Sequence, residues 1–309
     1  MKILIIKPSS LGDIIHGLIV AQAIKTQLPD AHITWVARDS FAPVLQSVEA
    51  VDRVISFNRR GGFFEFLRLL KEIRKEKYDA VLEMQGLLRS GIMAWAARAP
   101  VKIGRRDGRE GAQMFVNKLV ALPKDSRHAA DILMEFLPAL GMEKIYAPIK
   151  LKSPIAHPQL PANSILVFPS ARGKDSRAPK EWPYFKELTE KLIAELSKSN
   201  TNIRIAWCSD IKLKVPDGIL DFTGGKISLR ELLPFIAQAK LVISNDSGPM
   251  HMAAAAQVPL IALFGPTDPK LVGPYPPGSP QNRVIKSATG RIGDIKVEEV
   301  LRCVRELLK

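Results

Sequence analysis

The stretch "LVISNDSGPMHMAAAAQVPLIALFG", residues 241–265, contains one complete strand, turn, helix and strand pattern. An apolar run over 241–244 ends abruptly in Asn-Asp-Ser-Gly, and an alanine-rich helix is predicted over 248–256 before a second apolar run. Short apolar runs separated by a helix indicate a parallel sheet built from βαβ units. The turn either ends a strand and caps a helix, or it directs backbone N–H groups and the helix dipole at an anionic ligand.

The same alternation of strands and helices runs through both halves of the chain. In the first half, strands are predicted at 3–6, 32–37, 53–57, 79–84 and 101–104, with helices over about 14–28, 63–76 and 87–98. In the second half, strands are predicted at 165–168, 202–207, 241–244 and 260–265, with helices over about 182–197, 228–238, 248–256 and 296–309. Two doubly wound, Rossmann-like α/β domains facing each other across a cleft account for this pattern, and such folds bind ligands at the carboxyl ends of their strands.

Residues 146–164 are rich in proline and lack helical or strand periodicity, so they are predicted to form a linker. The expected boundaries are therefore an N-terminal α/β domain over 1–150 and a C-terminal α/β domain over 151–309. The final helix belongs to the second domain in sequence, but it can also pack back onto the first.

The composition indicates a soluble globular protein of 309 residues, 46% hydrophobic and 25% charged. No window approaches 18 uninterrupted apolar residues, so no transmembrane helix is expected. Cys208 and Cys303 are too few for a disulfide framework, which favours a cytoplasmic location. The net charge of +14 favours an acidic partner, which can be nucleic acid, a phosphorylated metabolite or an anionic membrane face.

Three loops fall at predicted carboxyl ends of strands and carry the candidate chemistry. The first, 7–17, has the spacing of neither a dinucleotide fingerprint nor a P-loop. Its Asp13 stands where the next helix is expected to begin, so it either caps that helix or acts as a general base on a substrate hydroxyl. Position alone does not choose between these two roles.

The second loop, 168–185, has a density of hydroxyl and cationic groups that suits a diphosphate as well as it suits a solvated surface: Ser170, Arg172, Lys174, Arg177 and Lys180. The third loop is the turn after residue 244, where Asp246 can orient its neighbours and the helix N-terminus can receive phosphate. His251 lies one turn into that helix, where a histidine more often packs or caps than binds a ligand.

A dedicated metal site is not expected. The sequence contains no Asp-x-Asp pair and no His/Cys cluster at ligand spacing. Charge on a leaving diphosphate would then be neutralised by Lys180, by hydroxyl groups and by backbone N–H groups.

Five segments together resemble one known family, the lipopolysaccharide heptosyltransferases of glycosyltransferase family 9. They are "ILIIKPSSLGDIIHGL" (3–18), "EMQGLLRSG" (83–91), "RHAADILMEFLPALG" (127–141), "PKEWPYF" (179–185) and "ISNDSGPMHMAAAAQVPLIALFGPTDP" (243–269). The resemblance spans nearly the whole chain in the same order. It implies a GT-B fold with an N-terminal acceptor-binding domain and a C-terminal donor-binding domain. It also implies no metal cofactor and inverting transfer of L-glycero-D-manno-heptose from ADP-heptose to the Kdo/heptose inner core of Gram-negative lipopolysaccharide.

The resemblance also implies roles for individual residues. Asp13 matches the family's proposed general base, Lys180 matches a lysine that pairs with the donor phosphates, and Ser170 stands at a phosphate-binding hydroxyl. The segment that holds the donor sugar and diphosphate is matched by Asp246, Ser247, Gly248 and His251. Lys174 and Arg177 can compete with Lys180 for the phosphate role.

Other positions match the family more loosely. Asp210 can take the place of the acidic group that grips the adenosine ribose, and Ile227 can face the adenine. For the acceptor, Kdo carboxylates and lipid A phosphates call for arginine, whose guanidinium binds such groups through two parallel hydrogen bonds. The candidates are Arg59, Arg60, Arg89, Arg105 and Arg106.

The basic chain is further expected to work at the anionic cytoplasmic face of the inner membrane as a peripheral protein. Two alternatives share the same architecture: a transferase using another nucleotide sugar, and a sugar-nucleotide epimerase or hydrolase. A nucleic-acid partner is not expected, because only 6% of the residues are aromatic and no recognised binding motif is present.

Overall fold

The structure, a computed structural model, describes residues 1–152, 157–171, 179–198 and 202–308. The chain divides into two compact units, Met1–Lys152 and Ser153–Lys309. Of the predicted linker 146–164, the described residues 146–152 and 157–163 contain neither a helix nor a named strand, whereas Ser164 already begins the first strand of the second unit.

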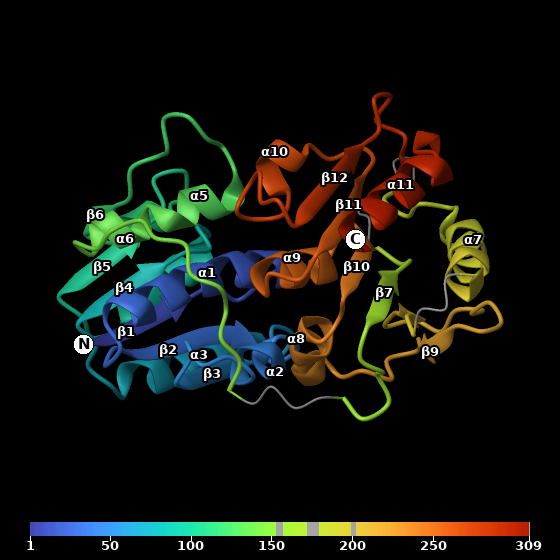
Figure 1. Cartoon of the computed structure of the whole chain (residues 1–309). Coiled ribbons are helices and arrows are strands. Elements are labelled where there is room, and N and C mark those ends of the chain that lie inside the picture. The colour runs from blue at the N-terminus through green and yellow to red at the C-terminus, as the bar shows by residue number, and fades with distance from the viewer. Residues whose placement is uncertain (153–156, 172–178, 199–201, 309) are drawn as a thin grey trace. The chain divides into compact units, whose positions relative to one another are not determined.

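The first unit is built on a parallel six-stranded sheet (Figure 1). In sequence order its strands are β1 (Lys2–Ile6), β2 (His32–Arg38), β3 (Arg53–Phe57), β4 (Ala80–Glu83), β5 (Val101–Gly104) and β6 (Lys118–Leu119). They lie side by side in the order β3-β2-β1-β4-β5-β6. The first five are the strands predicted from the sequence, whereas β6 has only two residues and shows no apolar run.

Helices form layers against this sheet. They are α1 (Leu11–Gln27), α2 (Ala42–Gln46), α3 (Gly62–Arg74), α4 (Leu88–Ala96), α5 (Ala129–Met134) and α6 (Phe136–Ala139), with a 3₁₀ turn over Ala112–Phe115. Helix α1 packs with α5 and α6, while α3 packs with α4. Leu69 of α3 and Met93 of α4 share one buried cluster with Leu4 and Val81 of the sheet. The helices on the other face of the sheet pack around α1, whose residues from Ile14 to Ile24 are buried.

Gly17 lets α1 approach the sheet closely. A Cβ atom at this position would lie 2.8 Å from the Trp35 ring, and the Trp35 indole N–H donates to the carbonyl oxygen of Lys7 at 3.1 Å. We expect Gly17→Ala to destabilise the first unit, because overpacking costs about 1–3 kcal/mol and exceeds the ~1 kcal/mol gain in helix propensity. Denaturant unfolding followed by tryptophan fluorescence measures the change. An unchanged midpoint would contradict the close packing, and Thr26→Ala on the exposed turn of α1 is the control.

The second unit repeats the architecture (Figure 1). Its strands are β7 (Ser164–Phe168), β8 (Arg204–Cys208), β9 (Leu220–Phe222), β10 (Leu241–Asn245), β11 (Leu260–Phe264) and β12 (Asn282–Lys286), in the parallel order β12-β11-β10-β7-β8-β9. Its helices are α7 (Phe185–Lys198), α8 (Leu229–Ala237), α9 (Gly248–Ala255), α10 (Pro269–Val272) and α11 (Val297–Leu308), with a 3₁₀ turn over Ile292–Asp294.

Two layers of helices pack on this sheet as well. Helix α8 packs with α9, and the final helix α11 packs on α7 and on β11 of its own unit.

The expected helix start near 182 is wrong, because α7 begins at Phe185. The backbone N–H of Trp182 donates instead to the Asn245 side chain at 3.0 Å, which holds this residue outside the helix.

Both sheets have the doubly wound strand order, which confirms the predicted fold class. The order reverses between β1 and β4 in the first unit and between β7 and β10 in the second. Open α/β sheets bind ligands at the carboxyl ends of the strands beside such a reversal.

Candidate functional site

In the first unit, Asp13 lies beside the strand reversal. Ile6 at the end of β1 pairs with Glu83 at the end of β4, so the segments that follow both strands start from the same edge. Ser10 is the N-cap of α1, and its backbone N–H and hydroxyl donate to Asp13 Oδ2 at 3.0 and 2.7 Å. Asp13 therefore does cap the helix, as one of the two predicted roles requires.

The other oxygen of Asp13 faces a buried lysine. Lys7 is 1% exposed, and its Nζ lies 3.3 Å from Asp13 Oδ1. Burial raises the pKa of Asp13, but the charge of Lys7 and the hydrogen bonds from Ser10 outweigh it, so the pKa lies below its usual range. Since the Asp13 side chain is 39% exposed, this ionised carboxylate is both oriented and accessible. Capping and acting as a base are compatible.

Further charged groups surround Lys7. Glu83 is 1% exposed and accepts the backbone N–H groups of Gln85 and Gly86 at 3.0 and 2.8 Å; burial raises its pKa. Burial lowers the pKa of Lys7, because it disfavours the charged ammonium. The charge of Asp13 opposes this shift, and the charge of Arg105 adds to it. Nothing in the sequence alone marks Lys7 or Glu83 as a site residue.

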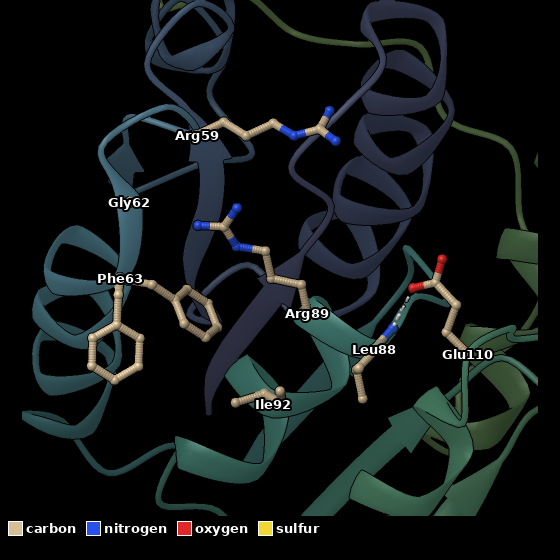
Figure 2. A pocket seen from close by; sticks show the side chains of 8 residues that line it. Arg59, Gly62, Phe63, Leu88, Arg89, Ile92 and Glu110 are labelled. Atoms are coloured by element: carbon tan, nitrogen blue, oxygen red, sulfur yellow. Dashed lines mark hydrogen bonds between the residues drawn. The ribbon is translucent and has the colours of Figure 1, made fainter.

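Two of the five arginines proposed for the acceptor line one pocket of about 380 Å³ (Figure 2). We call it the Arg–Phe pocket; its lining is Arg59, Gly62, Phe63, Phe66, Leu88, Arg89, Ile92 and Glu110. The guanidinium carbon of Arg89 lies 4.7 Å from the centre of the Phe66 ring and 5.5 Å from that of Phe57. This stacking orients a cation at an aromatic wall.

Arg38, at the end of β2, adds a third positive charge near Arg59 and Arg89. Burial is the main cause that lowers the pKa of Arg38, and the charges of Arg59 and Arg89 lower it further. Burial and the charge of Arg59 do the same for Arg89. Among the residues that the structure describes, no salt bridge joins any of the three to an acid. The three like charges are therefore available to an anion.

The other three proposed arginines lie elsewhere in the first unit. Arg105 donates from Nε and Nη2 to Asp107 at 2.9 and 2.6 Å, which holds it near Lys7 and Asp13. Arg60 and Arg106 have exposed side chains. The role of all five in acceptor binding remains a prediction.

In the second unit, Asn245 organises the strand reversal. Ser244 of β10 pairs with Phe168 of β7, and the Asn245 amide donates to the carbonyl oxygens of Phe168 and Pro169 at 3.3 and 2.9 Å. Its side-chain oxygen accepts the Trp182 N–H. One buried amide therefore fixes the loop after β7 and the turn before α7. Asn245 stands in the quoted segment 243–269, but the sequence alone assigns it no role.

Asp246 links Lys180 to a threonine in the next loop. Asp246 is 9% exposed, and its Oδ2 forms a salt bridge with the Lys180 ammonium and accepts the Thr267 hydroxyl at 2.7 Å. An ammonium has three N–H donors, so one bond to Asp246 leaves two for another anion. Thr267 stands in the quoted segment "GPTDP", but the sequence alone did not single it out.

The predicted turn at the start of α9 has the geometry of a helix N-terminus that can bind an anion. Ser247 is the N-cap in extended conformation, and Pro249 occupies the first turn. The helix begins at Gly248, so its first N–H groups lack intrahelical partners. His251 is 8% exposed and lies one turn inside.

Ser170 and the loop after β8 meet in the same unit. The hydroxyls of Ser170 and Ser209 lie 2.8 Å apart, and the Gly225 N–H donates to the Ser209 carbonyl oxygen at 3.1 Å. This places Asp210, next to Ser209, near the loop that leads to Ile227. The proposed phosphate competitors Lys174 and Arg177, like Arg172, lie outside the described residues.

Within the described ranges, no group of three or more His, Cys, Asp or Glu side chains is arranged to hold a metal ion. Over the same part of the chain, none of the helices combines the length and apolar character needed to cross a bilayer.

Two doubly wound units in one chain, each with a polar cluster at its strand reversal, define the GT-B class of glycosyltransferase architecture. The sequence model of glycosyltransferase family 9 (heptosyltransferase) matches residues 66–302. The chain belongs to this family, as the resemblance predicted.

Named relatives agree with this assignment. Lipopolysaccharide heptosyltransferase 1 of Escherichia coli K12 is 31% identical over 300 residues, which cover 89% of this chain and 91% of the relative. The structure of E. coli heptosyltransferase WaaC with ADP superposes with a TM-score of 0.80 at 26% identity, covering 99% of this chain and all of that one. WaaC with ADP-2-deoxy-2-fluoro heptose gives a TM-score of 0.77 at 26% identity, with 99% of each chain covered.

Proposed function

We propose that this enzyme transfers L-glycero-D-manno-heptose from ADP-heptose to the Kdo/heptose inner core of lipopolysaccharide. The observation that carries the proposal is the likeness to ADP-bound WaaC over the full length of both chains. The fluorinated ADP-heptose in the second WaaC structure supports ADP-heptose as the donor. The name of the E. coli relative supports a lipopolysaccharide acceptor.

Asp13 is the general base in this mechanism. Its carboxylate takes the proton from the acceptor hydroxyl while the hydroxyl oxygen bonds to the anomeric carbon. The bond from that carbon to the phosphate oxygen breaks on the opposite side, and ADP leaves with its electron pair. Because the pKa of Asp13 is low, the carboxylate is ionised at neutral pH. It takes up the proton as the new bond acidifies the hydroxyl.

The second unit holds the donor. Lys180, oriented by Asp246, and the N–H groups at the start of α9 stabilise the charge that develops on the departing diphosphate. Ser170 adds a hydroxyl, and Ser247, Gly248 and His251 face the sugar and diphosphate. Asp210 and Ile227 take the ribose and the adenine. These groups replace a metal ion, so we propose that the enzyme needs none.

The first unit holds the acceptor. Arg59 and Arg89 line the Arg–Phe pocket without an acidic partner in the described chain, which suits carboxylates and phosphates. Arg60, Arg105 and Arg106 are further candidates. The net charge of +14 would draw the enzyme to the anionic cytoplasmic face of the inner membrane, where it acts as a peripheral protein.

Acceptor dependence tests the reaction class. ADP release is measured with ADP-heptose alone and with a Kdo-bearing lipid A acceptor. We expect release only when the acceptor is present, whereas an epimerase or hydrolase would consume the donor without it.

Calorimetric titration with ADP-heptose, a UDP-sugar and a GDP-sugar tests the donor. Tighter binding of a UDP- or GDP-sugar would assign the enzyme to another nucleotide-sugar reaction.

Replacing Lys7 tests whether its charge lowers the pKa of Asp13. Lys7→Met keeps the length of the buried side chain but removes its charge, so the pKa of Asp13 should rise. A base works only when deprotonated, and we therefore expect the acidic limb of the pH profile of kcat/KM to move to higher pH. Lys25→Met, in the same unit at an ion pair with Asp52, is the control. If the rate falls but the acidic limb of the pH profile stays at the same pH, Lys7 has only a structural role.

A further inference from the structure

The Arg–Phe pocket has an apolar part that anion binding does not explain. Helix α3 begins at Gly62 and places Phe63 and Phe66 on one face, three residues apart. Leu88 and Ile92 contribute from α4. In Figure 2, Leu88 and Ile92 lie on one side of the space and the guanidinium groups of Arg59 and Arg89 on the other. The pocket therefore combines a hydrocarbon surface with a cationic one.

The apolar side chains remain strongly exposed. Phe63 is 67% exposed and Leu88 is 42% exposed, and the neighbouring Phe64 is 83% exposed. A cluster of large apolar side chains left in water at the mouth of a pocket marks a binding site. Phe66, by contrast, is partly buried against the core of the unit, so the pocket wall is anchored.

The polar groups of the pocket indicate which charged group the ligand carries beside its apolar part. Arg59 and Arg89, with Arg38 behind them, have no salt bridge to an acid within the described chain. The one lining acid, Glu110, accepts the Leu88 backbone N–H at 3.2 Å and lies beside Leu88 in Figure 2. A ligand with a hydrocarbon chain next to a phosphate or carboxylate matches both surfaces.

We propose that the Arg–Phe pocket binds one acyl chain of the lipid-linked acceptor, with Arg59 and Arg89 holding the anionic group beside that chain. This rests on the proposed function, which supplies a lipid-linked acceptor. The occupant is a single chain rather than the bilayer surface. A bilayer would contact every exposed apolar side chain of this face, including Phe64, whereas the pocket wall includes Phe63 and excludes Phe64.

Dodecyl phosphate below its micelle concentration is the probe, titrated by calorimetry against inorganic phosphate. We expect the wild-type protein to bind dodecyl phosphate at least about ten-fold more tightly than phosphate, because burying the chain adds favourable transfer free energy. Phe63→Ala should weaken binding of dodecyl phosphate about ten-fold, and Phe64→Ala should change it less than about two-fold. An equal loss in both variants would show that the chain lies across the exposed face, with no preference for the pocket, and would overturn the proposal. Absent binding, or binding unaffected by Phe63→Ala, would also overturn it.

A kinetic comparison separates this inference from the proposed function. Transfer is measured to the acylated acceptor and to the same acceptor with its acyl chains removed by hydrolysis. We expect Phe63→Ala to raise KM for the acylated acceptor only, with kcat unchanged. An equal rise in KM for both acceptors would contradict an acyl site. If the wild-type enzyme glycosylates neither acceptor, the proposed function fails, and the titration with dodecyl phosphate still tests the pocket.

Discussion

Asp13→Asn is expected to lower kcat by about 10²–10⁴-fold, the contribution typical of general base catalysis. Asparagine keeps an oxygen that can accept the two bonds from Ser10, so α1 should remain capped. The amide cannot accept the proton from the acceptor hydroxyl. Steady-state transfer assays with saturating ADP-heptose measure the loss.

Two controls make this result specific. The affinity for ADP, measured by calorimetry, should stay within about two-fold of wild type, since Asp13 lies in the unit assigned to the acceptor. The acidic limb of the pH profile should also disappear from whatever activity remains. Transfer within about three-fold of wild type would remove Asp13 as the base.

Lys180→Met is expected to lower kcat/KM for ADP-heptose by about 10²–10³-fold, the cost of losing one preorganised group that stabilises developing negative charge. The ammonium is held by Asp246, whose Oδ2 also accepts the Thr267 hydroxyl, so its position is set before the donor arrives. Methionine keeps the length of the side chain but cannot bind phosphate.

The matched control for Lys180 is Lys186→Met. Lys186 lies on α7 with a 71% exposed side chain, and it pairs with Glu190 one turn later. This change should leave kcat/KM within about two-fold of wild type, because an exposed pair contributes little. Equal losses in both variants would indicate a general effect of charge, and an unaffected Lys180→Met enzyme would exclude it from the donor site.

The buried parallel strands were readable from the sequence because both of their faces are covered. Strands such as β1 and β10 form short, nearly uninterrupted apolar runs. The strands missed by the sequence, β6, β9 and β12, lie at or near the ends of their sheets, and they are short or carry polar residues. Edge strands of this kind lack the apolar run on which the prediction depends.

Site residues that belong to a sequence motif could be predicted, whereas residues that only folding brings to the site could not. Asp13 and Lys180 stand in recognisable loops, so their candidacy follows from sequence and resemblance. Lys7 looks like an ordinary loop lysine before Pro8, and only the fold shows that it is buried against Asp13. Arg38 likewise lies about twenty residues from Arg59, and the fold brings the two charges together.

The proposed reaction is a direct displacement of ADP by an acceptor hydroxyl, without a metal ion. It is tested by NMR of the product formed from ADP-heptose labelled with carbon-13 at the anomeric carbon, using enzyme stripped with a chelator. We expect rapid transfer to a product whose anomeric configuration is opposite to that of the donor. Retained configuration, or transfer that begins only after magnesium is added, would contradict it.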